Sequence, residues 1–573
     1  MKKDHSDFRL YLLFSFFILL GAVILGRLFY LQVKDYKKYK TLAESQHIKE
    51  KKIYAKRGKV FFSDEATLLA ENQGVANVAV APREIKNRQE LISKLSLALS
   101  ISESSLSSKI KSNDPWIIIK NKVSLSKTEK IEDIPGVHLE PYFNRFYPQG
   151  EIASSLIGFY GFDQTGKKKV GQYGIEGYHE KQLAGKDGFR RGVVDANQDP
   201  IFSVQNQVKD PVDGSDLILT IDSNIQFFLE NKAKELFEKY KPDNATIIVM
   251  SPKTGEILGM ASSPNFDPNN YQKEKDVSVF KNPAVLPFEP GSIFKPLTAS
   301  IALEEKVVTP DTKYVDKGVL KISGFAIKNS DLKAHGTKTM TQVIEFSLNT
   351  GAVFMQQKIG RTKFVQYVKK FGFGKKTNID FYGEEAGDIE NILHPRSNAK
   401  LIECANASFG QGITANPVQI LMAFSAIANE GEMVKPHIVK KIIHQNGKVE
   451  EIKTKKVRKV ISPESASRTS AMMVSAVKNG YGKKAAVKGY LIAGKTGTAQ
   501  ASYSYFGIQK SGYSSRTIQS FINFAPAFKS EFILLIKMDG PRGGPRFSSD
   551  SLAPVAKEIN QYLFNYLGIP PKD

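Results

Sequence analysis

The chain is poor in the residues that build disulfides and metal sites. It has one cysteine and eight histidines among 573 residues. A single cysteine excludes an intramolecular disulfide, and its neighbours Ile402 and Ala405 indicate that Cys404 is a packed structural residue rather than a reactive thiol. The histidines form no His-Glu-x-x-His pair, and no acidic cluster has the spacing of a calcium loop. We therefore predict no metal and no cofactor.

Acidic residues are too few to balance the basic ones. The chain has 81 lysines and arginines against 58 aspartates and glutamates, which gives a formal net charge of +23. Such a charge attracts nucleic acid, phospholipid headgroups and anionic cell-wall polymers alike. The basic residues are spread along most of the chain, without zinc-finger spacing or an aromatic-rich RNA-binding signature. We therefore expect a solvated basic surface and no nucleic-acid partner.

One long apolar run lies near the N-terminus. Leu10 to Gly26 carries no charge, and Leu28 to Leu31 extends the run past Arg27. Together they reach the roughly 20 residues that a membrane-spanning helix needs. The alternative is a cleaved signal peptide, but the run is long for its apolar region and no small-x-small cleavage pattern follows. We predict a transmembrane anchor at residues 10–31 after a cytoplasmic tail at residues 1–9.

The orientation of this anchor does not follow from charge, because lysines and arginines flank the run on both sides. Only nine residues precede the run, so the folded mass follows it. We therefore expect the function to lie on the C-terminal side.

The remaining chain is too long for a single core, so we expect at least two folded units. Residues 46–214 mix short apolar stretches with Gly, Pro and Asp/Asn turns, and a helical, Ser-rich patch lies near Leu91 to Ser108. This pattern predicts an irregular α+β module.

A second domain is predicted at residues 215–573. It opens with strand patterns that alternate with one helix, and helices then cluster between early and late strands, which is an α+β order without internal repeats. The first predicted elements are a strand at Leu217–Ile221, a helix at Asn224–Lys239, and a pair of strands at Ala245–Met250 and Ile257–Ala261.

The tetrad Ser292-Ile-Phe-Lys295 is the first of three motifs that carry chemistry. Pro290-Gly291 ends a loop just before it, so we expect Ser292 in the first turn of a helix, where free N–H groups favour a developing alkoxide. Lys295 follows at i+3 on the same face, and a lysine whose pKa is lowered by burial or a cationic neighbour accepts a serine proton. Taken alone, Ser-x-x-Lys is equally typical of a capped surface helix.

The second motif is Ser347-Leu-Asn349. Ser347 and Asn349 flank Leu348, which directs two polar side chains the same way from an extended or tight-turn segment. Ser347 is a candidate to relay a proton, and Asn349 is a candidate to hold a substrate amide. By itself the triplet is typical of any turn.

The third motif is Lys495-Thr-Gly-Thr498. Residues 490–493 predict a buried strand that leads into it, and its glycines let a substrate backbone approach the strand edge. Lys495, Thr496 and Thr498 are candidates to bind a carboxylate, whereas the alternative is a Gly-rich turn with a surface lysine.

Residues 489–496 also match the phosphate-binding P-loop string. A P-loop needs a strand before its first glycine and a helix after its Thr. Residues 483–488 are a poor strand and Gly497 opposes a helix, so the context argues against nucleotide binding.

In this order the three motifs resemble the set found in penicillin-binding proteins and class A β-lactamases, with Ser292 as the nucleophile. Much of the chain resembles a class B penicillin-binding protein, in particular the division-specific septal peptidoglycan transpeptidases. The segments that resemble the family's non-catalytic pedestal are Arg145-Phe-Tyr-Pro148, Tyr173-Gly-Ile-Glu-Gly177 and Gly185-Lys-Asp-Gly188. Those that resemble its transpeptidase domain are Leu219-Thr-Ile-Asp222, Ser263-Pro264, Phe266-Asp267-Pro268, Phe288-Glu-Pro-Gly-Ser292, Ser408-Phe-Gly-Gln-Gly412 and Gly494-Lys-Thr-Gly-Thr-Ala-Gln500.

Three further features favour division over elongation within this family. They are Glu289, Phe371-Gly-Phe-Gly374 and Tyr566-Leu-Gly-Ile-Pro-Pro571. The resemblance implies an α+β fold made of a single transmembrane helix, an elongated pedestal (dimerisation-type) domain and a serine penicillin-recognising transpeptidase domain, the last an antiparallel sheet with helices on both faces.

The resemblance also implies a reaction. Ser292 attacks the carbonyl of a D-Ala-D-Ala stem peptide and releases the last D-Ala, and an amine of a neighbouring stem then takes the acyl group. Lys295 is the base for acylation, Ser347 and Lys495 shuttle protons to the leaving group, and Asn349 orients the peptide.

The remaining implied roles belong to the third motif. Backbone N–H groups of Ser292 and Thr498 form the oxyanion hole, and the hydroxyls of Thr496 and Thr498 bind the terminal carboxylate, with Gly497 between them in the substrate-binding segment. β-Lactams acylate Ser292 as substrate mimics.

Two segments depart from the family pattern. After Arg57-Gly58 the usual Asp-Arg-x-Gly continuation is replaced by Phe62-Ser-Asp-Glu-Ala66, and the Gly-Gly before the final Ala-Pro is replaced by Ser548-Ser-Asp-Ser551. The first affects the pedestal, and we expect the second to lie near the entrance of the cleft.

The alternatives are an elongation-type transpeptidase, a D,D-carboxypeptidase or β-lactamase, and a membrane β-lactam sensor or division scaffold that does not turn over. The long pedestal and the anchor favour transfer over hydrolysis, and no Glu-x-x-Leu-Asn segment supplies a deacylating glutamate between Asn349 and Lys495.

By family analogy the expected partners are stem peptides, β-lactams, the membrane, a polytopic glycosyltransferase and other division proteins. The expected location is the cytoplasmic membrane, with the catalytic domain on its outer side.

Overall fold

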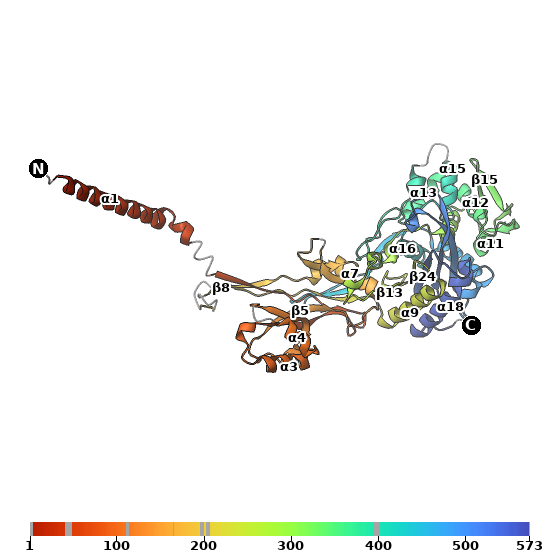
Figure 1. Cartoon of the computed structure of the whole chain (residues 1–573). Helices are drawn as coiled ribbons and strands as arrows, with labels where there is room; N and C mark the ends of the chain where they lie inside the picture. The colour runs from red at the N-terminus through yellow and green to blue at the C-terminus, as the bar shows by residue number, and fades with distance from the viewer. Residues whose placement is uncertain are drawn as a thin grey trace. The chain divides into compact units, whose positions relative to one another are not determined.

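The computed structural model of the chain describes residues 4–40, 48–110, 114–163, 165–194, 200–201, 207–394 and 400–571. The chain divides into two compact units (Figure 1). The N-terminal unit comprises Met1–Lys56 and Gly185–Asp213, and the main unit comprises Arg57–Ala184 and Gly214–Asp573.

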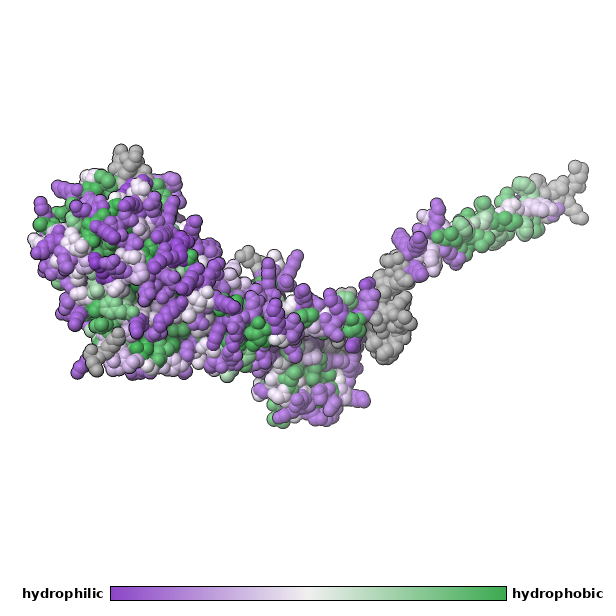
Figure 2. All heavy atoms as spheres, turned by 180° about the vertical axis from the view of Figure 1, so that it is seen from behind, coloured by the Kyte–Doolittle hydropathy of each residue, from purple (hydrophilic) through white to green (hydrophobic). Residues whose placement is uncertain are grey.

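The N-terminal unit contains the apolar helix that the sequence predicts. Helix α1 (Asp4–Phe29) continues into a π-helical turn at Tyr30–Lys34. Within residues 7–34 the most apolar stretch of 18 residues has a mean hydropathy of 2.4 and contains no buried residue, and Figure 2 shows apolar atoms covering this helix. In the part of the chain that the structure describes, it is the one helix long and apolar enough to cross a membrane.

The same unit contains a small antiparallel sheet. Strand β8 (Gly188–Val194) pairs with β1 (Ile48–Ile53), β10 (Gln207–Lys209) and β9 (Pro200–Ile201). The sheet thus joins the segment after the predicted anchor to a segment far along the chain.

A larger sheet opens the main unit. Its order is β20-β19-β11-β2-β3-β4, and β5 also pairs with β3. The strands are β2 (Val60–Phe61), β3 (Leu68–Val80), β4 (Ile117–Ser124), β5 (Val137–Phe146), β11 (Asp216–Leu219), β19 (Val439–Ile443) and β20 (Val449–Glu451). Because this sheet takes strands from both sides of residue 215, the domain limits 46–214 and 215–573 stay a prediction.

The predicted Ser-rich helical patch is two helices against this sheet. Helices α3 (Arg88–Leu99) and α4 (Glu103–Lys109) are capped by the side chains of Asn87 and Ser102. Leu91, Leu95 and Leu99 recur every four residues and are buried on strands β3 and β4. The serines are thus the polar face of an ordinary amphipathic pair.

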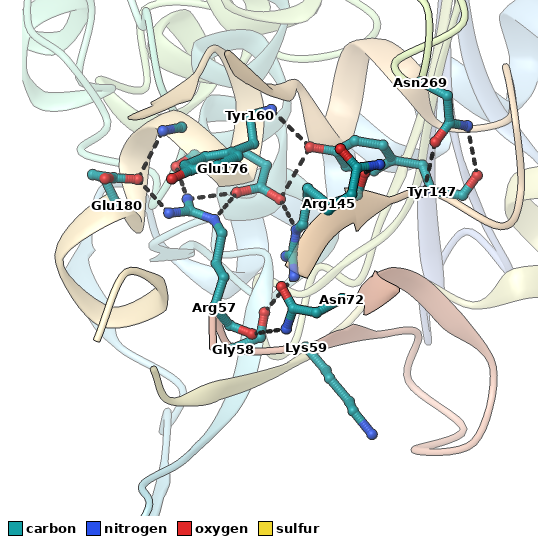
Figure 3. A network of polar contacts seen from close by, with 12 residues as sticks. Arg57, Gly58, Lys59, Asn72, Arg145, Tyr147, Tyr160, Glu176, Glu180 and Asn269 are labelled. Atoms are coloured by element: carbon teal, nitrogen blue, oxygen red, sulfur yellow. Dashed lines mark hydrogen bonds and ion pairs between the residues drawn. The ribbon is translucent and has the colours of Figure 1, made fainter. Parts of the chain in front are cut away.

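A buried polar cluster braces the pedestal part of the main unit, and we call Arg57, Arg145, Tyr147, Glu176 and Glu180 the pedestal cluster (Figure 3). Glu176 is fully buried and accepts from Arg57 Nε at 2.6 Å and from Arg145 Nε at 2.7 Å. Tyr147 donates its hydroxyl to Glu176 at 3.3 Å, and Arg57 also pairs with Glu180 at 2.6 Å. The two arginines lower the pKa of Glu176 against the effect of its burial.

The second part of the main unit is built on a five-stranded antiparallel sheet of order β13-β12-β24-β23-β22. Strands β12 (Asn244–Met250) and β13 (Ile257–Ser263) confirm the predicted strand pair. The other three strands are β24 (Phe532–Asp539), β23 (Tyr513–Ala525) and β22 (Ala493–Ser502). Strand β22 is the edge of this sheet.

Helices cover both faces of the five-stranded sheet, as the resemblance implies. Helix α9 (Ser223–Tyr240), which confirms the predicted helix, packs on one face with α18 (Ser548–Tyr566) (Figure 1). The opposite face packs against α10 (Lys295–Glu304), α16 (Pro417–Ala428) and α17 (Pro463–Lys478). The strands are apolar on both sides because Ile247 and Val249 enter one core and Ile248 and Met250 the other.

Further elements complete the main unit. The helices are α5 (Leu125–Thr128), α6 (Ser154–Ile157), α7 (Gly174–Tyr178), α8 (Glu180–Leu183), α11 (Met340–Glu345), α12 (Asn349–Ile359), α13 (Arg361–Lys370), α14 (Glu390–Leu393) and α15 (Lys400–Ala407). The strands are β6 (Phe159–Phe162), β7 (Lys169–Gln172), β14 (Lys313–Asp316), β15 (Val319–Ile322), β16 (Phe325–Lys328), β17 (Gly336–Thr339), β18 (Glu432–Val434) and β21 (Lys456–Lys459).

Candidate active site

The three sequence motifs meet at one cavity beside strand β22. The cavity has a volume of about 400 Å³, and its lining includes Ser292, Ser347, Thr496 and Thr498. These residues are up to 206 positions apart in the chain, so their convergence is a property of the fold.

Ser292 lies in a 3₁₀ turn (Gly291–Phe294), and helix α10 begins at Lys295. We call this turn the nucleophile turn, after the role predicted for Ser292. The serine therefore precedes the α-helix, instead of lying in its first turn as the sequence predicted. Gly291 has a φ of +57° and donates its N–H to the carbonyl of Gly410 at 2.9 Å. A Cβ on Gly410 would lie 2.3 Å from the carbonyl oxygen of Gly291. The Ser408–Gly412 segment therefore needs a glycine at position 410 to pack against the nucleophile turn.

Lys295 is fully buried between the first two motifs. Its Nζ lies 2.9 Å from Ser292 Oγ, 2.5 Å from the carbonyl oxygen of Ser347 and 3.2 Å from Ser347 Oγ. Burial, reinforced by the charge of Lys495, holds the pKa of Lys295 well below its usual value. A neutral amine 2.9 Å from a hydroxyl is able to accept its proton.

Lys495 completes the group from the third motif. Its Nζ donates to Ser347 Oγ at 2.8 Å and to the carbonyl of Thr496 at 3.0 Å. Burial lowers the pKa of Lys495 to about 7. Among the described residues, neither Lys295 nor Lys495 has a carboxylate as hydrogen-bond partner, and Ser347 Oγ bridges the two amines.

Ser347 lies in the tight turn between α11 and α12. Its φ of +54° is left-handed, and Leu348 packs inward with 1% exposure, as the sequence predicted for the middle residue. Asn349 starts α12 and donates its side-chain amide to the carbonyl of Lys328 at 2.8 Å. In the described part of the chain Asn349 makes no hydrogen bond to Ser292, Lys295, Ser347 or Lys495, so its role stays a prediction.

Two residues that the sequence did not single out hold the start of α12. Asn329 accepts from the N–H of Asn349 at 3.0 Å and donates to Asp316 at 2.8 Å. Asp316 also accepts from the hydroxyl of Thr350 at 2.8 Å. Asn329 and Asp316 lie 18 and 31 positions before Ser347. Single polar residues so far from a motif leave no spacing signal, so sequence patterns do not reveal them.

The third motif is itself a strand. Strand β22 begins at Ala493, so the predicted strand at residues 490–493 is displaced along the chain. Thr496, Gly497 and Thr498 therefore lie on the sheet edge, which is able to pair with an extended peptide. A Cβ on Gly497 would lie 2.9 Å from a methyl of Ile293, so this glycine lets the strand approach the nucleophile turn.

The nucleotide-binding alternative is wrong for this segment. Residues 483–485 form a 3₁₀ turn instead of a strand, and the motif's Thr496 lies within strand β22 instead of starting a helix. The N-terminal helix end that binds phosphate in a P-loop is thus missing at this position.

Glu289 ties the nucleophile turn to two neighbouring segments. Its carboxylate accepts from the hydroxyl of Tyr513 at 3.0 Å and from the N–H of Gly412 at 3.2 Å. Burial raises the pKa of Glu289 to about 7. In the sequence, Glu289 stood out only through its resemblance to division enzymes, and no motif or spacing indicated that Tyr513 contacts it.

Both departures from the family pattern have a defined structure. Phe62 is buried and Asp64 caps the turn between β2 and β3 by accepting from the N–H of Thr67 at 2.8 Å. Ser548 and Ser549 line the cavity that contains Ser292, at the start of α18. The second departure therefore lies at the cleft, as expected.

Cys404 has no place in this site. It is buried in α15, and burial raises the pKa of its thiol to about 11. A thiol held protonated is a poor nucleophile, which agrees with the structural role predicted for it.

Comparison with known proteins gives the family. Residues 245–561 match the penicillin-binding protein transpeptidase domain, and residues 52–219 match the penicillin-binding protein dimerisation domain. The chain is 32% identical to stage V sporulation protein D of Bacillus subtilis over 575 residues, which cover 98% of this chain and 86% of that protein. It is 27% identical to peptidoglycan D,D-transpeptidase FtsI of Escherichia coli over 589 residues, which cover 100% and 94% of the two chains.

A solved structure agrees with this assignment. Penicillin-binding protein 3 of Mycobacterium tuberculosis in complex with aztreonam superimposes with a TM-score of 0.68 at 25% identity, covering 91% of this chain and 98% of that one. With both domains matched along one chain, the protein belongs to the class B penicillin-binding proteins and is a D-Ala-D-Ala transpeptidase of the septal type.

Proposed function

We propose that this chain crosslinks peptidoglycan stem peptides during septal wall synthesis through an acyl-enzyme on Ser292. Ser292 Oγ attacks the carbonyl carbon of the penultimate D-Ala, the bond to the terminal D-Ala breaks, and that D-Ala leaves as a free amino acid. An amine of a second stem then attacks the ester, forms the new amide and releases Ser292.

The observation that carries this proposal is the buried chain of Ser292, Lys295, Ser347 and Lys495. Neutral Lys295 takes the proton of Ser292 across 2.9 Å. The proton reaches the departing amine through Ser347, whose Oγ is 2.8 Å from Lys495 Nζ. Two amines that share one hydroxyl in a buried site suit proton transfer in both directions, which acylation and deacylation both need.

Strand β22 supplies the binding half of the site. The backbone N–H groups of Ser292 and Thr498 are the proposed oxyanion donors, each worth about 3 to 4 kcal/mol in transition-state stabilisation. The hydroxyls of Thr496 and Thr498 bind the terminal carboxylate, and Asn349 orients the peptide. An extended stem peptide pairs with the free edge of the sheet.

The apolar helix α1 is the proposed single membrane anchor of the cytoplasmic membrane. In this arrangement residues 1–9 are cytoplasmic, residues 10–31 span the bilayer and the catalytic part faces the outer side, where peptidoglycan is made. A polytopic glycosyltransferase beside the anchor and other division proteins are the proposed partners.

The test of the nucleophile is the intact mass of the full-length protein in detergent, with and without benzylpenicillin. We expect an adduct of one drug mass on the natural protein and none on Ser292→Ala. A matched control is Ser300→Ala, since Ser300 is buried in helix α10, which directly follows the turn of Ser292, and donates to the carbonyl of Leu297. It should still acylate.

The second half of the test separates transfer from hydrolysis and from sensing. Incubated with a pentapeptide stem donor and an amine acceptor, the natural protein should yield the crosslinked product with one D-Ala released for each crosslink. D-Ala release without crosslinks would point to a carboxypeptidase, and a penicillin adduct without any D-Ala release would point to a sensor or scaffold.

A further inference from the structure

Ser548 places a third hydroxyl beside the two threonines of strand β22. Its N–H donates to Thr498 Oγ1 at 3.2 Å, and Thr498 Oγ1 donates to Ser548 Oγ at 3.4 Å. Ser548 is only 1% exposed, yet it lines the cavity that contains Ser292 and Thr496. This serine stands in the segment where the chain departs from the glycines of its family pattern.

The fold fixes Ser548 at this place. Gln519 on β23 lies opposite Thr498 in the register of the two strands. Its side-chain amide donates to the carbonyl of Pro545 at 2.9 Å and accepts from the hydroxyl of Ser551. The strand pair that carries Thr498 therefore also holds the segment that leads into α18, and Ser548 is set against Thr498 by buried contacts.

The hydrogen bonds between Thr498 and Ser548 limit where each hydroxyl proton is donated. The N–H of Ser548 occupies an acceptor site of Thr498 Oγ1, so the hydroxyl proton of Thr498 points away from that amide. In this structure that proton is donated to Ser548 Oγ, whose residue lines the cavity. An anion in the cavity is able to take this proton as well as the proton of Ser548, because a carboxylate has about four acceptor sites.

We propose that Ser548 Oγ is a further donor to the terminal carboxylate of the donor stem peptide, and that the Ser548 amide orients the Thr498 hydroxyl for the same ligand. The ligand class is a C-terminal D-amino acid carboxylate or the carboxylate of a β-lactam. This inference rests on the proposed function, in which Thr496 and Thr498 bind that carboxylate.

The neighbouring residues of the segment have other partners. Ser549 Oγ donates to Asp550 at 3.2 Å, and Asp550 pairs with Lys484 at 2.7 Å. Ser549 lines the cavity but makes no hydrogen bond to Thr498 among the described residues. It is therefore the matched control for Ser548.

The experiment compares two thioester substrates on the full-length protein in detergent. One is N-benzoyl-D-alanyl thioglycolate, whose leaving group carries a carboxylate, and the other has a primary amide in place of that carboxylate. Thiol release gives kcat/KM for each, and their ratio is the preference for the carboxylate. Ser548→Ala removes the hydroxyl and keeps the backbone N–H that orients Thr498.

We expect Ser548→Ala to lower kcat/KM about tenfold for the carboxylate thioester, mostly through KM, and less than twofold for the amide, as expected for one lost hydrogen bond to a charged group. Ser549→Ala should change neither value more than about twofold. Ser548→Gly, which restores a family-type residue, should behave as Ser548→Ala, and it decides the case if the alanine variant does not fold.

Three other outcomes would overturn the inference. Equal losses of kcat/KM on both substrates would make Ser548 a structural residue only, and an unchanged kcat/KM on both substrates would remove it from carboxylate binding. If the natural protein itself shows no preference for the carboxylate, the proposed role of Thr496 and Thr498 fails first, and the inference fails with it.

Discussion

The main unit contains two buried clusters of ionisable residues, and the two clusters differ in how the cost of burying a charge is met. In the pedestal cluster, Glu176 is surrounded by Arg57 and Arg145, and every charge has a partner of the other sign (Figure 3). In the active site, Lys295 and Lys495 are two buried amines that share the hydroxyl of Ser347 and, among the described residues, contact no carboxylate.

The difference appears in the direction of the pKa shifts. The arginines lower the pKa of Glu176, so the pedestal cluster keeps its charges. Burial lowers the pKa values of Lys295 and Lys495, so the active site favours neutral amines. Pairing makes a cluster a structural brace, and the lack of a counter-charge makes it chemically reactive at neutral pH.

The largest expected effect that tests this comparison belongs to Lys295. Lys295→Met keeps a long side chain and removes the base, so acylation by benzylpenicillin should slow by about 10² to 10⁴-fold. Its melting temperature should not fall, because a buried amine without a counter-ion is costly to the fold. Stopped-flow acylation and thermal unfolding measure the two quantities.

The matched control is Lys358→Met, since Lys358 is exposed on helix α12. It should alter neither acylation nor melting temperature. A Lys295→Met variant that melts far below the natural protein and still acylates at the natural rate would reverse the assignment of the two clusters.

The next effect in size belongs to the pedestal cluster. Glu176→Gln leaves Arg57 and Arg145 without their shared carboxylate, and breaking a buried ion pair costs about 3 to 5 kcal/mol. The melting temperature should therefore fall, whereas the acylation rate of molecules that remain folded should stay within about twofold of the natural value, because the cluster touches no active-site residue among those described.

Glu180→Gln supplies the graded comparison for this prediction. Glu180 pairs with Arg57 but its side chain is 26% exposed, so its loss should cost about 1 kcal/mol or less. Equal destabilisation by the two substitutions, or a large loss of acylation in Glu176→Gln, would contradict a purely structural role.

The sequence predicted one of these clusters far better than the other. The active-site cluster is recognisable because its chemistry demands fixed local spacings. In the structure each member lies within 3.2 Å of the next, in the order Ser292, Lys295, Ser347 and Lys495. The pedestal motifs were noted separately, but nothing local indicates that Glu176 meets Arg57.

The contacts that escaped sequence reasoning are long-range ones. The pairing of Gln519 with Thr498 depends on the register of two strands, and the approach of Ser548 depends on where α18 begins. The anchor, the first strand pair and helix α9 were predicted because periodicity is local. The nucleophile turn and the start of β22 were misplaced by a few residues, since glycine and proline mark a boundary without fixing its geometry.

A smaller effect follows from the pKa of Lys495, which is about 7 in the folded protein and about 10.4 in an unfolded chain. Between these values the unfolded state binds more protons, so this residue makes stability rise with pH. Lys495→Met should therefore raise the melting temperature most at pH 7 and progressively less towards pH 10. The opposite trend, or a gain that does not change with pH, would mean that Lys495 stays charged in the fold.

The pedestal cluster should show its own dependence at the acidic end. The pKa of Glu176 is lowered, so its contribution to stability is present above the unfolded value of about 4.3 and is lost as the pH falls below it. The difference in stability between the natural protein and Glu176→Gln should thus disappear in acid. The difference in stability between the natural protein and Lys495→Met should change only above about pH 7.

The smallest effect concerns Glu289, a half-buried carboxyl that pairs with no cation in the part of the chain that the structure describes. Its pKa of about 7 lies above the unfolded value, so the folded state binds more protons between about pH 4.3 and 7 and stability falls as the pH rises through that window. Glu289→Gln should be neutral in stability at pH 5 and stabilising by about 1 kcal/mol or less at pH 8, with melting curves at both pH values as the measurement. Tyr513→Phe removes the hydroxyl that donates to Glu289, so it should steepen the same loss. A stability difference between the natural protein and Glu289→Gln that is the same at pH 5 and pH 8 would place the carboxyl of Glu289 among the ordinary surface acids.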